Sequence, residues 1–375
     1  MITTKLKGFL VLLAVLLLSC ESSEDTMIAS TNDDNDTEVP IEIGVMRNIS
    51  AMQLVADMKP GWNVGNSLDA EGPSETYWGN PRITKSLIDA LKDRGFGTLR
   101  IPVTWRFHTG EAPNYRIEQS WLNRVEEVVN YGLDNEMYVI INMHHDEEWI
   151  IPTYAQADAV KDRLEKNWTQ IANHFKNYSD YLIFETLNEP RYEGQPEEWT
   201  GTPEWKDVVN QYHKTALDAI RATGGNNSVR HIMISSYAAS QGAIDDLVIP
   251  NNDERTIVSL HNYFPFDFSL SGNDTSWGTQ NDKDEMDGTF DHIYNTFIVN
   301  NTPVIMGEWG NLNHNSTNTA DRLAHASYYA NGLVNRQILP IWWDNGNNEE
   351  YALIDRQTLE WNFPEIADAI IASKE

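Results

Sequence analysis

The chain has 375 residues, of which 41% are hydrophobic, enough for a sizeable core in one large domain or two ordinary ones. Its formal net charge at pH 7 is −29. The folded part should therefore repel nucleic acid and anionic membrane surfaces, and we exclude both as partners. A neutral ligand is compatible with this charge, although a large charge can also serve solubility alone. We expect a monomer.

The N-terminal segment has the pattern of an export signal. Lys5 and Lys7 precede an apolar run at 9–18 that is too short to span a bilayer. The following "LLLSC" resembles a bacterial lipobox, in which cleavage leaves Cys20 as a lipidated first residue. A plain secretory signal with an incidental cysteine is the alternative. Because Cys20 is the single cysteine, the folded part has no disulfide, cysteine ligand or cysteine nucleophile.

These features predict a lipoprotein signal peptide at 1–19, an acidic flexible tether at 20–41 and a folded domain at 42–375. The stretch 21–40 holds seven acidic residues and no Lys or Arg, so it cannot form a core. We expect a protein lipid-anchored to the bacterial cell envelope, at the outer membrane. The acids after Cys20 resemble surface-export signals of Bacteroidetes lipoproteins, but the sequence leaves open which face of that membrane the protein occupies.

Strand-like and helix-like segments alternate along the rest of the chain. The strand candidates lie at 61–66, 98–103, 138–146, 181–190, 231–239, 256–264, 303–310 and 339–346. Helices are predicted at 81–94, with Pro81 in the first turn, and at 121–135, 157–177, 204–223, 288–300, 320–335 and 364–373, and a short helix is predicted to follow Ser50 as its N-cap. Most strand candidates are continuous apolar runs, as in parallel strands buried on both faces. Eight such units predict a single-domain (β/α)8 TIM barrel, with a doubly wound sheet as the alternative.

Polar and aromatic residues gather at the C-terminal ends of these strands, the end that carries the active site in a TIM barrel. They are Asn63, Asn66, Arg100, His144, His145, Asn188, Glu189, His261, Tyr263, Glu308 and Trp343. Trp78, Trp149 and Trp309 also lie on or just after strand ends, where an aromatic face can stack on a sugar ring, although core packing is the other interpretation for any tryptophan.

Two carboxylates stand out among these residues. Glu189 ends the fourth strand candidate and Glu308 the seventh, and these strands face each other across a closed barrel. Two carboxylates that converge on one site can divide into a proton donor and a nucleophile when their environments differ. Their separation distinguishes a retaining from an inverting glycosidase, and the sequence cannot measure it. Two solvated loop glutamates remain the alternative.

The run "IFETLNEP" at 183–190 contains a second glutamate in an apolar strand. Strand alternation places Glu185 and Glu189 on one face. Pro190 cannot continue a central strand, so the chain should turn there and let Asn188 and Glu189 both reach the cavity. Glu185 then lies one layer deeper and needs a cation, for which Arg100 is the candidate. We therefore expect Glu189 to react and Glu185 to be structural.

Three histidines at strand ends are also candidate metal ligands. His261 and Tyr263 share a strand face and can hydrogen-bond a carboxylate or a sugar hydroxyl, or be satisfied core groups. His144 and His145 are adjacent, whereas a metal hydrolase in a barrel wants histidines at alternating strand positions. The sequence therefore predicts no metal ion.

Taken together, these motifs resemble glycoside hydrolase family 5, over residues from about 50 to 373. The closest stretches are "GWNVGNSLDA", "ETYWGNP", "LRIPVTW", "INMHHDE", "FETLNEP", "LHNYFP", "IMGEWG" and "WWDNG". The set is most similar to subfamily 4, the endoglucanase and xyloglucanase group. The family often has Phe after its nucleophile, where this chain has Trp309.

The resemblance implies roles for individual residues. Glu189 would be the general acid/base and Glu308 the nucleophile of a retaining, double-displacement mechanism that needs no cofactor. The remaining residues would contact or orient the substrate and the nucleophile: Asn63, Asn66, Arg100, His144, His145, Asn188, His261, Tyr263, Trp309 and Trp343, with His145 the least certain and Trp343 as the stacking platform.

The resemblance also implies a substrate class: β-1,4-linked glucans such as xyloglucan, mixed-linkage glucan and soluble cellulose, cut within the chain. An endo-β-1,4-mannanase is the nearest alternative, because the catalytic set is shared. A non-catalytic surface glycan-binding lipoprotein is the alternative from another class, and it would lack one carboxylate, whereas both are present. The sequence does not fix the preferred glucan or the tolerance of branches.

Overall fold

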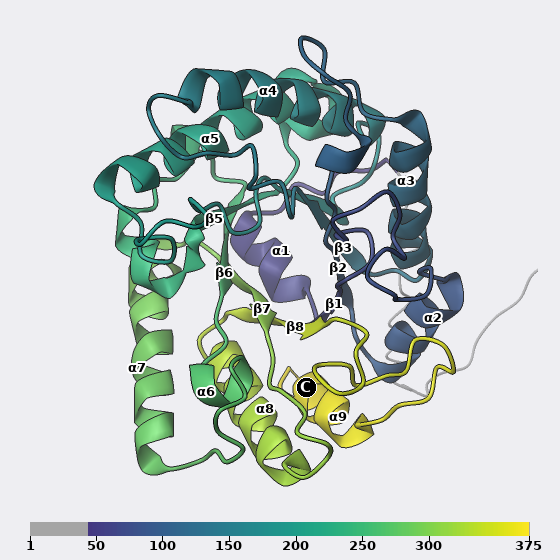
Figure 1. Ribbon diagram of the computed structural model, residues 1–375, viewed down its shortest axis with the longest axis vertical. Helices are drawn as coiled ribbons and strands as arrows, with labels where there is room; N and C mark the ends of the chain where they lie inside the picture. The colour runs from purple at the N-terminus through teal and green to yellow at the C-terminus, as the bar shows by residue number, and fades with distance from the viewer. Residues whose placement is uncertain (1–43, 375) are drawn as a thin grey trace, which may run out of the picture. The chain divides into compact units, whose positions relative to one another are not determined.

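The computed structural model describes residues 44–374, and these form a closed barrel of eight parallel strands (Figure 1). Each strand pairs with its sequence neighbours, and the eighth strand pairs with the first. The strands are Gly61–Val64 (β1), Thr98–Ile101 (β2), Tyr138–Asn142 (β3), Leu182–Glu185 (β4), Ile232–Ser240 (β5), Thr256–His261 (β6), Val304–Trp309 (β7) and Leu339–Asp344 (β8). The predicted TIM barrel is confirmed, and the doubly wound alternative is excluded. The predicted signal peptide and tether lie outside the described residues.

Helices surround the barrel on its outer side (Figure 1). They are Lys85–Arg94 (α2), Gln119–Asp134 (α3), Ala157–His174 (α4), Pro203–Ala222 (α5), Phe266–Ser269 (α6), Gln280–Thr296 (α7), Thr319–Val334 (α8) and Pro364–Ala372 (α9). Short 3₁₀ helices lie at Arg106–His108, Gly225–Ser228, Gln241–Asp246, Pro250–Asn252 and Ile298–Asn300. Within the described part of the chain, none of the helices has the length and apolar character needed to span a bilayer.

Two helices begin elsewhere than predicted. Helix α2 starts at Lys85, not near Pro81, because Thr84 is its N-cap and accepts a hydrogen bond from the Leu87 N–H at 3.3 Å. Helix α7 starts at Gln280, eight residues before the predicted start, with a capping box formed by Thr279 and Asp282. Its first turns are strongly polar, so apolar periodicity gave no sign of them.

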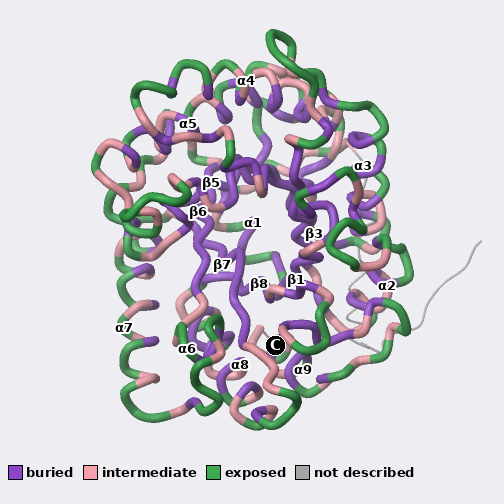
Figure 2. The backbone as a smooth tube through the Cα atoms, in the orientation of Figure 1, coloured by how far each residue is buried: buried purple, intermediate pink, exposed green. Residues whose placement is uncertain are grey.

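The barrel interior has an apolar floor. A short helix before the barrel, Ala51–Asp57 (α1), begins at the predicted N-cap Ser50 with a capping box and lies at the N-terminal end of the strands. Its Leu54 packs in one buried cluster with interior side chains of the strands, such as Ile140, Ile183 and Ile305. Buried residues dominate the strands in Figure 2, and this floor leaves the opposite end of the barrel for polar groups.

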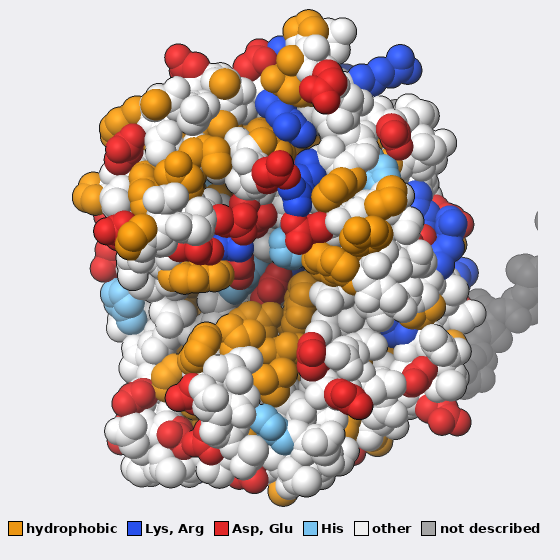
Figure 3. Space-filling view, in the orientation of Figure 1, with side chains coloured by type: hydrophobic (Ala, Val, Ile, Leu, Met, Phe, Trp, Pro, Cys, Tyr) orange, Lys and Arg blue, Asp and Glu red, His pale blue; other side chains and the backbone are white. Residues whose placement is uncertain are grey.

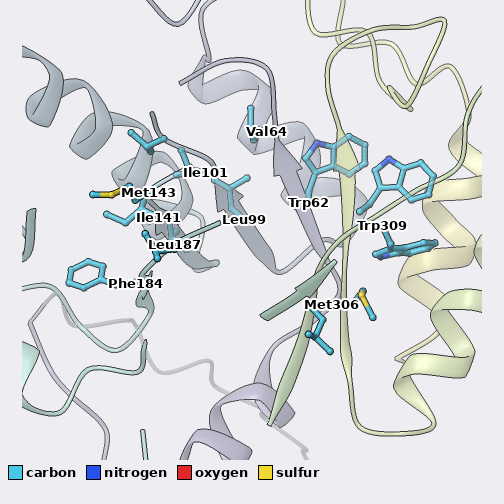
Figure 4. Packing of buried hydrophobic residues seen from close by; sticks show 14 of the residues in the cluster. Trp62, Val64, Leu99, Ile101, Ile141, Met143, Phe184, Leu187, Met306 and Trp309 are labelled. Atoms are coloured by element: carbon cyan, nitrogen blue, oxygen red, sulfur yellow. The ribbon is translucent and has the colours of Figure 1, made fainter. Parts of the chain in front are cut away.

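The outer face of the barrel wall forms the larger core. Strand residues that point away from the barrel axis pack against the helices, and Leu99, Ile141, Phe184 and Met306 are examples (Figure 4). Both faces of each strand are therefore buried, which explains why the strands read as continuous apolar runs in the sequence.

Substitution by alanine should have opposite effects on stability at two helix glycines. An alanine Cβ at Gly132 in α3 would lie 2.6 Å from Cγ2 of Val139, whereas at Gly288 in α7 it would meet nothing within 4 Å. Gly288→Ala should stabilise the fold by about 0.5–1 kcal/mol, the usual helix gain over glycine. Gly132→Ala should destabilise it, because overpacking costs about 1–3 kcal/mol. Thermal unfolding of both variants measures this, and equal shifts of the melting temperature would contradict the packing argument.

Candidate active site

A buried arginine organises the polar end of the barrel interior. Arg100 in β2 has no exposed surface. Its Nε donates to Glu185 Oε2 at 2.8 Å, and its Nη1 donates to Asn63 Oδ1 and to Glu308 Oε1, each at 2.8 Å. Its Nη2 donates to Asn188 Oδ1 at 2.7 Å. Burial alone would lower the pKa of Arg100, but the charges of Glu185 and Glu308 outweigh burial and raise it.

Glu185 is the deeper partner of this arginine, as the sequence predicted. It ends β4 and is fully buried. Besides the Arg100 contact, its Oε2 accepts from Asn142 Nδ2 at 3.0 Å and its Oε1 accepts from Ser259 Oγ at 2.5 Å. Because both carboxylate oxygens are held by side chains of β2, β3 and β6, Glu185 forms part of the scaffold.

Glu189 lies in the turn that follows β4. The strand ends at Glu185, and residues 186–190 leave the sheet. Two backbone hydrogen bonds fix this turn: Asn188 N–H to the Met143 carbonyl at 2.9 Å, and Ala238 N–H to the Pro190 carbonyl at 3.0 Å. The predicted turn thus brings Asn188 to Arg100 and Glu189 to His261, although the two residues are consecutive.

A bulge in β7 directs Glu308 into the barrel. Leu260 pairs with Met306 but the next residue, His261, pairs with Glu308, so Gly307 is an extra residue on β7. Strict alternation from the inward-facing Ile305 would have pointed Glu308 outward. Gly307 is required there, because a Cβ on it would lie 2.9 Å from Ser259 Oγ and 3.1 Å from His261 Nε2.

The same bulge turns Trp309 out of the barrel, so the prediction that Trp309 contacts the substrate is wrong. Trp309 has no exposed surface, and its ring stacks on Tyr329 of α8 at 4.4 Å and meets Trp342 of β8 edge-on at 5.1 Å. Figure 4 shows it with Trp62 and Met306 in the outer core. Trp309 therefore packs against the helices and does not line a substrate site.

The two candidate catalytic carboxylates meet at His261. Ligand-type atoms of Glu189, His261 and Glu308 all lie within 4.8 Å of one another. His261 Nδ1 is 2.7 Å from Glu189 Oε1 and 3.7 Å from Glu308 Oε2. Tyr263 donates its hydroxyl to Glu308 Oε2 at 3.0 Å. Glu308 is therefore fixed by Arg100 on one oxygen and by Tyr263 on the other.

The pKa values of Glu189, Glu308 and His261 are shifted in different directions. Burial acts to raise the pKa of Glu189, but the His261 hydrogen bond and charge outweigh it and lower the pKa. Burial raises the pKa of Glu308 against the charges of His261 and Arg100. Burial would lower the pKa of His261, but the two glutamates raise it. These directions favour a proton on His261 next to an ionised Glu189.

A row of aromatic rings borders this cluster. His144 lies parallel to Trp343 with ring centroids 6.0 Å apart, His145 meets His144 edge-on at 4.4 Å, and Trp78 meets His145 at 5.6 Å. Burial lowers the pKa of His144 well below its usual value and that of His145 to about 4, so both are neutral at pH 7. Figure 3 shows this face hollowed at its centre, with acidic and histidine side chains at the bottom and hydrophobic ones beside them.

A buried, paired set of carboxylates at the C-terminal end of a barrel, bordered by aromatic rings, is what a glycosidase requires. The family model described as cellulase, glycosyl hydrolase family 5, matches residues 63–349.

The chain belongs to glycoside hydrolase family 5.

Similar proteins agree with this family 5 assignment. The cellulase/esterase CelE of Acetivibrio thermocellus is 51% identical over 335 residues, which cover 87% of this chain but only 41% of CelE. The solved structure of ZgEngAGH5_4 in complex with a cellotriose is 57% identical with a TM-score of 0.85, covering 87% of this chain and 99% of that one. The GH5-4 broad specificity endoglucanase from Clostridium acetobutylicum is 49% identical with a TM-score of 0.84, covering 86% of this chain and 100% of that one.

One polar residue, Asn63, has different contacts in this family 5 site from those predicted. Asn63 is fully buried, and its Nδ2 donates to the Gly307 carbonyl at 2.8 Å, so it fixes the bulge and Arg100 and does not contact substrate. Arg100 orients Glu308 and pairs with Glu185, as predicted. The hydrogen bonds described for Asn66 use its backbone, whose positive φ of 54° forms the turn after β1.

Four residues around the family 5 site were missed by sequence reasoning. Asn142 and Ser259 hold Glu185, and each is a polar residue inside an apolar strand, which was a usable signal. Arg191 lies 3.6 Å from the Glu189 carboxylate, and Glu147 lies 3.3 Å from Arg191. Both are in loops among many other charged residues, and nothing in the sequence distinguished them.

The geometry also bears on metal binding. A second group, Asp69, His144 and His145, has ligand-type atoms within 4.8 Å of one another. Asp69 already accepts backbone hydrogen bonds from Asn66 at 2.8 Å and Ser67 at 2.6 Å, and His144 Nδ1 lies 3.0 Å from Asn142 Nδ2. Asp69 and one ring nitrogen of His144 are therefore already engaged by the protein, and the absence of a metal ion stays a prediction.

Glu185→Gln should destabilise the protein strongly while leaving the two candidate catalytic carboxylates in place. Removing one partner of a buried ion pair costs about 3–5 kcal/mol, because Arg100 would keep its charge. Urea unfolding measures the loss. Glu127→Gln is the matched control, since Glu127 also pairs with an arginine, Arg124, but is 46% exposed. A Glu185→Gln variant that is fully stable yet inactive would assign Glu185 to the chemistry.

Proposed function

We propose that this chain is a retaining endo-β-1,4-glucanase in which Glu189 is the general acid/base and Glu308 the nucleophile. The observation that carries the proposal is the closeness of the two carboxylates, which have oxygens within 4.8 Å of each other. Retaining glycosidases hold this pair about 5–5.5 Å apart, whereas inverting enzymes need about 6.5–9.5 Å to admit a water between them.

The first step forms a bond between Glu308 and the sugar. Glu308 attacks the anomeric carbon while Glu189 gives a proton to the departing glycosidic oxygen, so the chain breaks and a glycosyl-enzyme remains. Arg100 and Tyr263 hold the attacking carboxylate in one orientation. The proton that Glu189 needs is available from His261 Nδ1, 2.7 Å away.

The second step releases the sugar. Glu189, ionised after the first step, takes a proton from a water that attacks the same carbon from the side that the leaving group vacated. The bond to Glu308 breaks and the configuration is retained. Asn188, held by Arg100 beside Glu189, is placed to hydrogen-bond the 2-hydroxyl of the reacting sugar, and Trp343 offers its ring as a stacking surface.

The substrates are β-1,4-linked glucan chains: xyloglucan, mixed-linkage glucan and soluble cellulose. Support comes from two of the similar structures, the broad specificity endoglucanase and the cellotriose complex. Both carry the subfamily 4 designation in their names. Partly exposed aromatic side chains beside the cluster, such as Trp78, suit the apolar faces of several sugar rings.

The roles of the two glutamates predict opposite products with azide. Glu308→Ala and Glu189→Ala should each lower the kcat for native glucan by at least about 10²–10⁴-fold. With an aryl β-cellobioside that has a good leaving group, azide should replace Glu308 and give the inverted α-glycosyl azide. In Glu189→Ala azide should attack the glycosyl-enzyme and give the β-glycosyl azide. NMR distinguishes the two products.

Glu360→Ala, which removes an exposed glutamate, is the control and should retain wild-type turnover. The same anomer from both catalytic variants, or near wild-type turnover in either, would reject the assignment.

We further propose that the enzyme is anchored to the cell envelope through a lipid on Cys20. The support is the "LLLSC" sequence after a short apolar run. Cys20→Ser should move the protein from the membrane fraction to the soluble fraction without a change in specific activity. Equal detergent-phase partitioning of variant and wild type would argue against lipidation.

A further inference from the structure

Arg191, the residue that follows the "NEP" turn, makes the largest set of charged contacts near the acid/base. Its Nη1 donates to the Glu189 carbonyl at 3.2 Å and to Glu147 Oε1 at 3.3 Å. Its Nη2 donates to Glu193 Oε1 at 2.7 Å, and its Nε donates to Glu198 Oε1 at 3.1 Å. Every nitrogen of the guanidinium group is therefore fixed.

This fixed cation lies against the catalytic carboxylate. Arg191 Nη1 is 3.6 Å from Glu189 Oε2, and the Arg191 side chain is only 12% exposed. The indole of Trp199 lies over the guanidinium with 4.7 Å between Cζ and the ring centroid, and shields it from solvent. A charge held so close in a poorly solvated place interacts with Glu189 more strongly than a surface arginine would.

Without Arg191, the surroundings of Glu189 would be strongly acidic. Glu147, Glu193 and Glu198 cluster around Arg191, and an oxygen of Glu308 lies within 4.8 Å of one of Glu189. Burial raises the pKa of Glu147 to about 8 even with Arg191 beside it, so this carboxyl is mostly neutral at pH 7. Without Arg191 the ionised neighbours would repel charge on Glu189.

We propose that Arg191 is a positioning residue that sets the proton affinity of Glu189, so that one carboxyl can act as an acid in the first step and as a base in the second. The inference rests on the proposed function. Arg191 holds the peptide of Glu189 through its carbonyl and holds the carboxylate through its charge. The charge favours the ionised form that must accept a proton from water.

Other titratable groups also face Glu189 and have to be kept constant in a test. They are His261 at the end of β6, Tyr263 in the loop after it, Glu308 in β7, and His145 and Glu147 in the loop after β3. The side chains themselves stay the same in an Arg191 variant, although the pKa values of Glu147 and His145 also respond to the arginine charge. The comparison of two substrates therefore separates the effect on Glu189 as an acid from effects on these neighbours.

The experiment compares pH profiles of kcat/KM, whose basic limb reports the acid of the free enzyme. With cellotetraose, Arg191→Met should move this limb to higher pH by about one unit, because an opposite charge within about 4–6 Å lowers a carboxyl pKa by 1–3 units. Arg191→Lys keeps the charge and should keep the limb near its wild-type position. With 2,4-dinitrophenyl β-cellobioside, which leaves without protonation, the limb of Arg191→Met should coincide with that of the wild type.

Arg221→Met is the matched control. Arg221 in α5 is similarly buried and pairs with Asp253 at 2.9 Å, at the last turn of its helix. This variant should lose stability but keep the wild-type limb on both substrates. An Arg191→Met limb that coincides with the wild type on cellotetraose, or that moves equally on both substrates, would overturn the inference. Wild-type cleavage and the azide products test the proposed function separately.

Discussion

Arg100 carries a full positive charge at a place that water does not reach, and the rest of the site follows from the need to compensate it. An unpaired buried charge costs far more than the fold can spare. Two carboxylates, Glu185 and Glu308, provide the compensation, and two asparagines occupy the remaining donors. Glu308, the proposed nucleophile, is therefore held by the same contacts that make the buried charge tolerable, so its position is determined when the barrel folds.

The bulge at Gly307 makes this arrangement compatible with a closed barrel. A regular β7 would present Glu308 to the outer helices and Trp309 to the interior, and both would be misplaced. The extra residue exchanges them, and the Asn63 side chain holds it through the Gly307 carbonyl. The cost is a position that accepts no side chain, since Ser259 and His261 fill the space where a Cβ would lie.

The sequence predicted the barrel well because the signals that mark its strands and turns are local. Continuous apolar runs and their polar ends identified the strands. The turn followed from Pro190, and the Glu185–Arg100 pair followed from alternation and the need of a buried carboxylate for a cation. Trp309 was misplaced because its position at a strand end suggested the site, whereas a one-residue bulge that leaves no mark beyond a glycine turns it outward. Arg191 was missed because its partners come from loops, whose paths depend on tertiary contacts that periodicity does not encode.

The division of the barrel interior into an apolar floor under α1 and a polar layer around Arg100 has a consequence for how such a chain can change. The floor tolerates exchange of aliphatic residues at constant volume, because its contacts are non-directional. The polar layer does not, since replacing one member leaves its partners unsatisfied. Sequence drift can therefore accumulate at one end of the barrel while the other end stays fixed, so that related enzymes can diverge in robustness without diverging in reaction.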